Sequence, residues 1–139
     1  MSDARPMVEK RLDGTSVVVV DDDRDVRESI AAAFRAEGAD VREIGDGNGA
    51  VRACHDDLPD LVILDMMLPG RSGFLALEKI KGYEDAPYVI MVTANEGKRH
   101  QAYAEQIGVD GYMQKPVPLE RLLDQAVELL AEDLDENSE

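Results

Sequence analysis

The 139-residue chain has a single cysteine, no tryptophan and no apolar run long enough to span a membrane. One cysteine, Cys54, excludes an intramolecular disulfide and every metal site that needs several thiolates. The first segment, MSDARPMVEKRLDG, has no apolar core and does not resemble a secretory signal peptide. Together these absences predict a protein of the reducing cytoplasm that does not act in a membrane.

Basic residues are also scarce. Lysine and arginine total 15 against 30 aspartates and glutamates, which gives a formal net charge of −15 at pH 7. Such a field repels the phosphates of nucleic acids and the headgroups of anionic membranes. We therefore expect no direct nucleic-acid or membrane binding. Metal cations and basic protein surfaces are the partners that this charge favours.

What the chain does contain is a regular alternation of apolar runs and helical periodicity. Alternating strands and helices predict an α/β fold with a parallel sheet that helices cover on both faces. The expected strands are 16–20, 39–44, 61–64, 88–92 and 111–114, and the expected helices are 26–37, 50–55, 74–81, 96–107 and 118–132. The domain is thus predicted at 15–133. Residues 1–14 are expected to form a flexible extension, and residues 134–139 an acidic tail.

Polar side chains follow four of the five expected strands. Because the carboxyl ends of parallel strands meet at one edge of the sheet, these side chains should converge there. They are Asp21, Asp22 and Asp23 after the first strand, Asp65 after the third, Thr93 after the fourth, and Lys115 with Pro116 after the fifth. The second strand contributes no obvious reactive group, and Asp23 is interpreted as a solvated acid.

Clustered carboxylates repel one another unless a cation lies between them. Mg²⁺ (or Mn²⁺) takes oxygen ligands, so Asp22 and Asp65 are expected to bind it directly, and Asp21 directly or through water. A carboxylate beside such an ion can attack phosphorus and become an aspartyl phosphate. Lys115 and the Thr93 hydroxyl would then contact the transferred phosphoryl oxygens.

Four segments, taken in order, resemble the receiver domain of two-component response regulators over about 16–132. They are VVVVDDD, LVILDMMLPGRSG, VTA (92–94) and GYMQKP (111–116). The resemblance implies a flavodoxin-like, doubly wound sheet with strand order 2-1-3-4-5. It also implies a stand-alone, chemotaxis-receiver-like phosphoacceptor, not an enzyme, which a histidine kinase or phosphotransfer protein phosphorylates with the help of Mg²⁺.

The same resemblance assigns roles to individual positions. Asp65 matches the phosphoacceptor, while Asp21, Asp22 and the Met67 backbone carbonyl match the metal ligands. Thr93, Ala94, Tyr112 and Lys115 match the phosphate-binding and switch positions, and the Lys115–Pro116 peptide bond is expected to be cis. A downstream effector would bind the face formed by residues 96–132, and phosphorylation-dependent homodimerisation stays open.

Four alternatives compete with parts of this interpretation. A haloacid-dehalogenase-like phosphatase would use the D-x-D of Asp21 and Asp23, but Asp25 stands where that family has threonine or valine. A receiver-like scaffold that is never phosphorylated is a further option, as is a receiver excised from a longer chain. The GDGNGA segment, 45–50, fits a loose dinucleotide fingerprint, although a turn with a helix cap is favoured.

Overall fold

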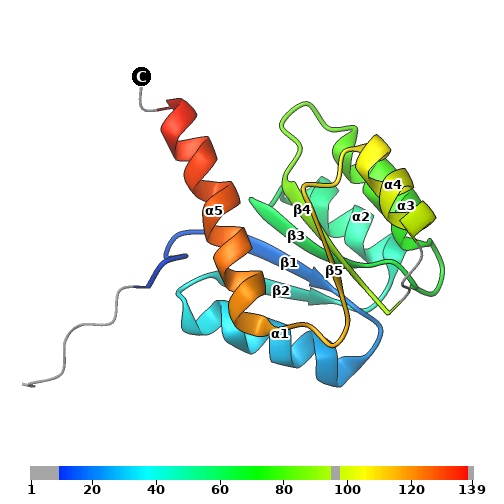
Figure 1. The fold of residues 1–139 in the computed structure, drawn as a ribbon, viewed down its shortest axis with the longest axis horizontal. Coiled ribbons are helices and arrows are strands. Elements are labelled where there is room, and N and C mark those ends of the chain that lie inside the picture. The colour runs from blue at the N-terminus through cyan, green and yellow to red at the C-terminus, as the bar shows by residue number, and fades with distance from the viewer. Residues whose placement is uncertain (1–9, 95–97, 138–139) are drawn as a thin grey trace, which may run out of the picture.

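The computed structural model describes residues 10–94 and 98–137, in which five strands alternate with five helices (Figure 1). The strands are β1 (Ser16–Val20), β2 (Asp40–Ile44), β3 (Leu61–Asp65), β4 (Tyr88–Thr93) and β5 (Gly111–Gln114). The helices are α1 (Arg24–Ala36), α2 (Gly47–Asp56), α3 (Gly73–Lys81), α4 (Lys98–Ile107) and α5 (Leu119–Asn137). All strand pairs are parallel, in the order β2-β1-β3-β4-β5, which confirms the predicted fold.

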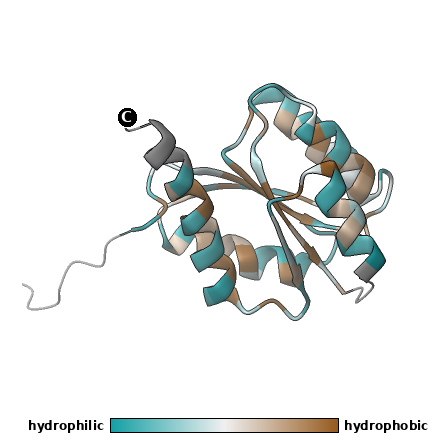
Figure 2. Cartoon of the chain, turned by 45° about the horizontal axis from the view of Figure 1, so that its top comes forward, coloured by the Kyte–Doolittle hydropathy of each residue, from teal (hydrophilic) through white to brown (hydrophobic). Residues whose placement is uncertain are grey.

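Alternate residues of the central strands supply two separate cores. On β1, Val17 and Val19 face the cluster formed with α1 and α5, whereas Val18 and Val20 face the cluster formed with α2, α3 and α4. The strands are therefore apolar throughout, as strands buried on both faces must be. Figure 2 shows brown apolar strands between helices whose outer surfaces are largely teal. This double packing gives the sheet a fixed edge on which a site can be built.

Side-chain caps determine where three helices begin. Asp23 caps α1, Asp46 caps α2 by accepting a hydrogen bond from the Gly49 amide, and Ser72 caps α3. The GDGNGA segment is thus a turn with a helix cap, as favoured from the sequence. Asp23 is exposed to solvent, as interpreted from the sequence, and its carboxylate in addition accepts hydrogen bonds from two amides of the first helical turn.

The carboxyl-terminal boundary also needs correction. Helix α5 continues to Asn137, through most of the predicted tail, because residues 131–137 contain no glycine or proline that would end a helix. The predicted start of the fourth helix at Glu96 falls among residues 95–97, outside the described residues. None of the helices in the described part of the chain has the length and apolar content needed to cross a membrane.

Residues 10–14 belong to the domain, contrary to the expected flexible extension over 1–14. Leu12 is only 1% exposed and packs in the core cluster under α1 and α5, and its amide donates to the Glu37 carbonyl oxygen at 2.9 Å. Arg11 forms ion pairs with Glu37 and Asp124. The sequence did not reveal this because one leucine in a polar segment has no periodicity to read.

We predict that Leu12→Ala lowers the free energy of unfolding by about 2–4 kcal/mol, because it opens a cavity in the core. Leu75→Ala is the matched control, since Leu75 is 56% exposed and should lose much less. Urea unfolding of the two variants and the wild type measures the difference. Equal losses in the two variants would show that residues 10–14 do not pack as described.

Candidate functional site

The register of the sheet brings the polar side chains together. Val20 of β1 pairs with Leu64 of β3, so the next residues, Asp21 and Asp65, lie side by side at the carboxyl edge. Thr93 of β4 pairs with Gln114 of β5, which places Lys115 one residue beyond that edge. The parallel register thus brings together residues that are far apart in the sequence.

Lys115 bridges the two buried acids. Its ammonium Nζ lies 2.8 Å from Asp21 Oδ2 and 3.4 Å from Asp65 Oδ2. Asp21 is 2% exposed and Asp65 4%, whereas Asp22 is exposed to solvent. The predicted convergence of these four residues is confirmed, and two of the three acids are removed from water.

The ionisation of the pocket reflects its crowding. Burial, followed by the charge of Asp21, raises the pKa of Asp65 to about 6, although Lys115 acts in the opposite direction. Burial alone would lower the pKa of Lys115, but its hydrogen bond to Asp21 and the charge of Asp65 raise it overall. The lysine therefore stays protonated, while the pocket disfavours the ionised form of Asp65.

The donor set fits a hard divalent cation. Carboxylate oxygens of Asp21, Asp22 and Asp65 lie within 4.8 Å of one another. Three carboxylates face one ammonium, so the charges of the pocket are unbalanced without a further cation. All the donors are oxygen atoms, as Mg²⁺ and Mn²⁺ prefer.

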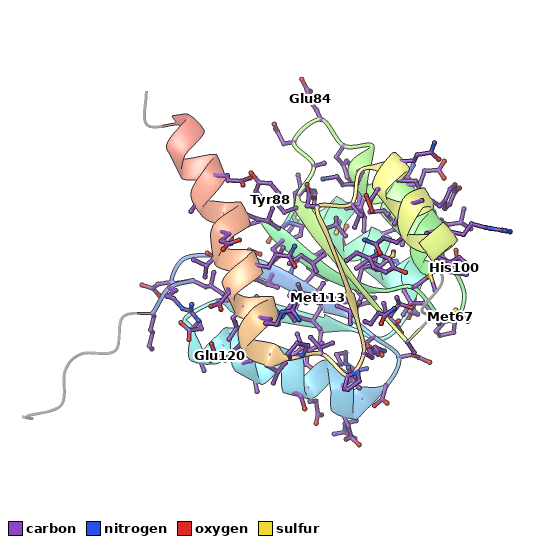
Figure 3. The ribbon with its side chains drawn as sticks, in the orientation of Figure 1. Met67, Glu84, Tyr88, His100, Met113 and Glu120 are labelled. Atoms are coloured by element: carbon purple, nitrogen blue, oxygen red, sulfur yellow. The ribbon has the colours of Figure 1, made fainter. Side chains whose placement is uncertain are left out.

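Met67 follows Asp65 by two residues, on the loop between β3 and α3 (Figure 3). Its amide donates to Asp65 Oδ1 at 3.4 Å, and its side chain points to solvent with 65% exposure. An exposed side chain on a loop attached to the acid agrees with a role for the Met67 backbone and not its thioether. The assignment of its carbonyl as a metal ligand stays a prediction.

Arg27 and Glu43 support the site but were not identified from the sequence. Arg27 of α1 donates to the Asp21 carbonyl oxygen at 2.9 Å, and its Nε lies 3.4 Å from Glu43 of β2. The Asp23 amide also donates to Asp21 Oδ1 at 2.9 Å. These contacts fix Asp21 from its backbone and from its side chain. Charged residues of opposite sign on adjacent elements were the available signal, but it is too common to be specific.

The remaining predicted residues lie at the end of β4, directly after it, and on β5. Thr93 is fully buried and Ala94 is exposed. Tyr112 has a buried hydroxyl for which the described residues provide no hydrogen-bond partner, and burial raises its pKa. The Lys115–Pro116 peptide bond is cis, as the resemblance implied.

Comparison with solved structures identifies close structural relatives of this arrangement. A CheY-like response regulator receiver domain protein from Methanospirillum hungatei matches with a TM-score of 0.84 and 26% identity, covering 88% of this chain and 98% of that one. The BeF₃-activated receiver domain of RstA from Klebsiella pneumoniae matches with a TM-score of 0.74 and 28% identity, covering 80% and 94%.

A third structure, the complex of CheX with CheY, BeF₃ and Mg²⁺ from Borrelia burgdorferi, shares the fold. Its TM-score is 0.81 at 22% identity, covering 88% of this chain and 98% of that one. The family model of the response regulator receiver domain matches residues 17–127, which include all of β1 except Ser16, β2 to β5, the acidic pocket and about the first half of α5. The chain therefore belongs to the receiver-domain family of two-component response regulators.

Proposed function

We propose that this receiver domain accepts a phosphoryl group on Asp65 from a histidine kinase or a phosphotransfer protein in the cytoplasm. The observation that carries the proposal is the pairing of Lys115 with two buried carboxylates at the edge of the sheet. A buried acid with a raised pKa, placed beside a fixed cation, has the features of a reactive group and not of a surface acid.

The transfer needs an ionised Asp65. One of its carboxylate oxygens attacks phosphorus, an oxygen–phosphorus bond forms, and the bond from phosphorus to the donor's imidazole nitrogen breaks. The electron pair leaves on the imidazole, which takes up a proton from solvent. Lys115 balances the charge of the phosphoryl oxygens. In this proposal the Thr93 hydroxyl, at the end of β4, donates to one of those oxygens.

A divalent cation fits between Asp21, Asp22 and Asp65, with the Met67 carbonyl as a further ligand. When bound, it supplies positive charge that neutralises the carboxylates and the incoming phosphoryl oxygens. The protein's own contribution is to hold three oxygen donors within 4.8 Å before the ion arrives. Arg27 helps by fixing the Asp21 backbone.

Two alternatives from the sequence lose support. The phosphatase would need Asp23 as its second acid, but that carboxylate caps α1. A scaffold without phosphorylation would not require the oxygen cluster and the bridging lysine to be intact, yet both are present. Both observations support the proposal of a signalling phosphoacceptor, which at most promotes its own phosphorylation and dephosphorylation.

The output would pass from Thr93 to Tyr112. A phosphoryl group on Asp65 gives the Thr93 hydroxyl a new charged acceptor, which is worth about 1.5–3 kcal/mol. The Tyr112 hydroxyl, buried and without a partner among the described residues, gains by moving to a new position. This would reshape the face of α4, β5 and α5, where an effector binds.

We predict that acetyl phosphate and Mg²⁺ add one phosphoryl group to the wild-type protein and none to Asp65→Asn. Intact-mass analysis followed by peptide mapping measures the product. Asp85→Asn, which changes an exposed acid on the loop before β4, is the matched control and should be phosphorylated like wild type. Phosphorylation of Asp65→Asn on Asp21 would revive the phosphatase alternative.

Neighbouring acids provide a test of the metal site. Asp22→Ala should weaken Mg²⁺ binding by roughly tenfold or more, because a charged oxygen ligand is lost, without lowering the stability of the metal-free protein. Asp23→Ala should instead keep the affinity and lose about 1 kcal/mol of stability, because it removes a helix cap. Calorimetric titration and urea unfolding separate the two effects, and unchanged affinity in Asp22→Ala would exclude it as a ligand.

The raised pKa of Asp65 predicts a specific pH dependence in metal-free protein. Its pKa is about 6 when folded and 3.8 when exposed, so the folded state binds more protons between these values and loses stability as pH rises through them. Asp65→Asn lacks this loss. Its stability relative to wild type should therefore grow by about 2–3 kcal/mol from pH 4 to 7.

Urea unfolding across this range in the presence of a chelator measures the difference. Saturating Mg²⁺ should reduce it, because the cation favours the ionised carboxylate. A difference between the two proteins that stays constant with pH would show that Asp65 is not destabilised by its surroundings.

A further inference from the structure

The loop of residues 66–72, between the phosphoacceptor and α3, is fastened at its base. The Gly73 amide donates to the Met66 carbonyl oxygen at 2.9 Å, which closes the loop on itself. The Met67 amide donates to Asp65 Oδ1 at 3.4 Å. Any displacement of this loop is therefore transmitted to the carboxylate that receives the phosphoryl group.

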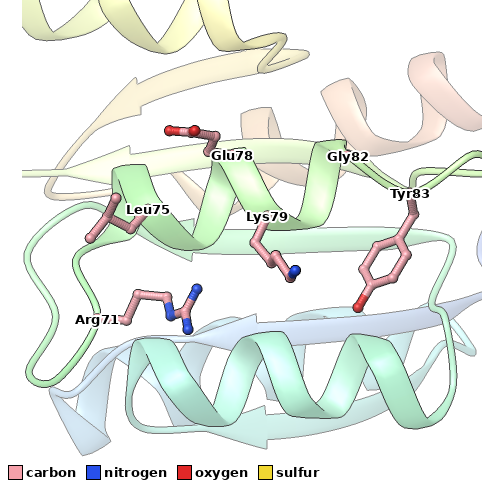
Figure 4. A pocket seen from close by; sticks show the side chains of 6 residues that line it. All are labelled: Arg71, Leu75, Glu78, Lys79, Gly82 and Tyr83. Atoms are coloured by element: carbon pink, nitrogen blue, oxygen red, sulfur yellow. The ribbon is translucent and has the colours of Figure 1, made fainter.

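The far end of the same loop is held by the first turn of α2. The Gly47 amide lies 3.4 Å from the Pro69 carbonyl oxygen, and Arg71 Nε donates to Asn48 Oδ1 at 3.1 Å. Figure 4 shows the Arg71 side chain extending from the loop toward α2. At Gly47 a methyl group would collide with the Arg71 backbone, so this approach requires glycine.

We infer that the GDGNGA turn is a positioning element for the metal site, acting through Gly47 and Asn48 on the loop that carries Met67. The inference rests on the proposed function, because the Met67 carbonyl is a metal ligand only within it. A loop that is already held in place does not have to be ordered when the cation binds. The turn follows β2, so this part of the chain contributes to the site although β2 itself supplies no reactive group.

If the Asn48–Arg71 bond had a purely structural role, its loss would lower the stability of the whole fold. A positioning role predicts a different result. Asn48 is exposed, and a hydrogen bond at the surface contributes little to global stability. Loss of the Asn48–Arg71 bond should consequently leave urea unfolding almost unchanged while it loosens the loop. Mg²⁺ affinity and amide hydrogen exchange of residues 66–72 report on the loop, and the urea midpoint reports on the fold.

The experiment is a double-mutant cycle with Asn48→Ala and Arg71→Met. Each single variant should weaken Mg²⁺ binding roughly two- to tenfold and speed exchange in residues 66–72. The double variant should bind Mg²⁺ as tightly as the single variant with the lower affinity, because both changes remove the same bond. Arg52→Met, at an exposed position on α2, is the control for the loss of one positive charge and should not weaken binding.

Additive losses in the cycle, or an equal loss in Arg52→Met, would overturn the inference. The inference would also be overturned if Asn48→Ala kept its Mg²⁺ affinity while Asp22→Ala lost it. The proposed function would stand in that case. A wild-type protein that binds no Mg²⁺ would overturn both. Gly47→Ala adds a stronger displacement of the loop and should weaken Mg²⁺ binding further if it folds.

Discussion

The ion pair between Lys115 and two buried aspartates is the interaction on which the site depends. Burying a carboxylate is costly unless it is paired, and Asp21 and Asp65 share one ammonium between them. The shorter contact goes to Asp21, and the pKa of Asp65 is raised. Asp65 is thus the less neutralised member of the pair, and under the proposed function an additional cation, or a phosphoryl group with its cation, would relieve that imbalance.

The rest of the fold keeps this costly arrangement in place. Central strands that are apolar on both faces provide a rigid edge, and their register aligns Asp21 with Asp65. Arg27 holds the Asp21 backbone from α1, and Glu43 of β2 holds Arg27 in turn. The strand without a reactive group therefore supports those that have one, as the surroundings of a preorganised site generally must.

The sequence predicted the sheet, its helices and the acidic edge because these follow from periodic apolar residues and from polar residues at strand ends. It did not reveal the packing of Leu12, the continuation of α5 to Asn137 or the cap formed by Asp23. These depend on single contacts or on the absence of a helix breaker, which leave no pattern. The same holds for Arg27, whose function becomes visible only once the β1–α1 loop is folded against β2.

A crystal structure of the protein with beryllofluoride and Mg²⁺ would test the central claim most directly. The account predicts beryllium bonded to a carboxylate oxygen of Asp65, the metal ion held by Asp21, Asp22 and Asp65, and the Lys115 ammonium directed at a fluorine atom. Beryllofluoride bound elsewhere, or Lys115 still paired with Asp21 alone beside an occupied Asp65, would contradict it.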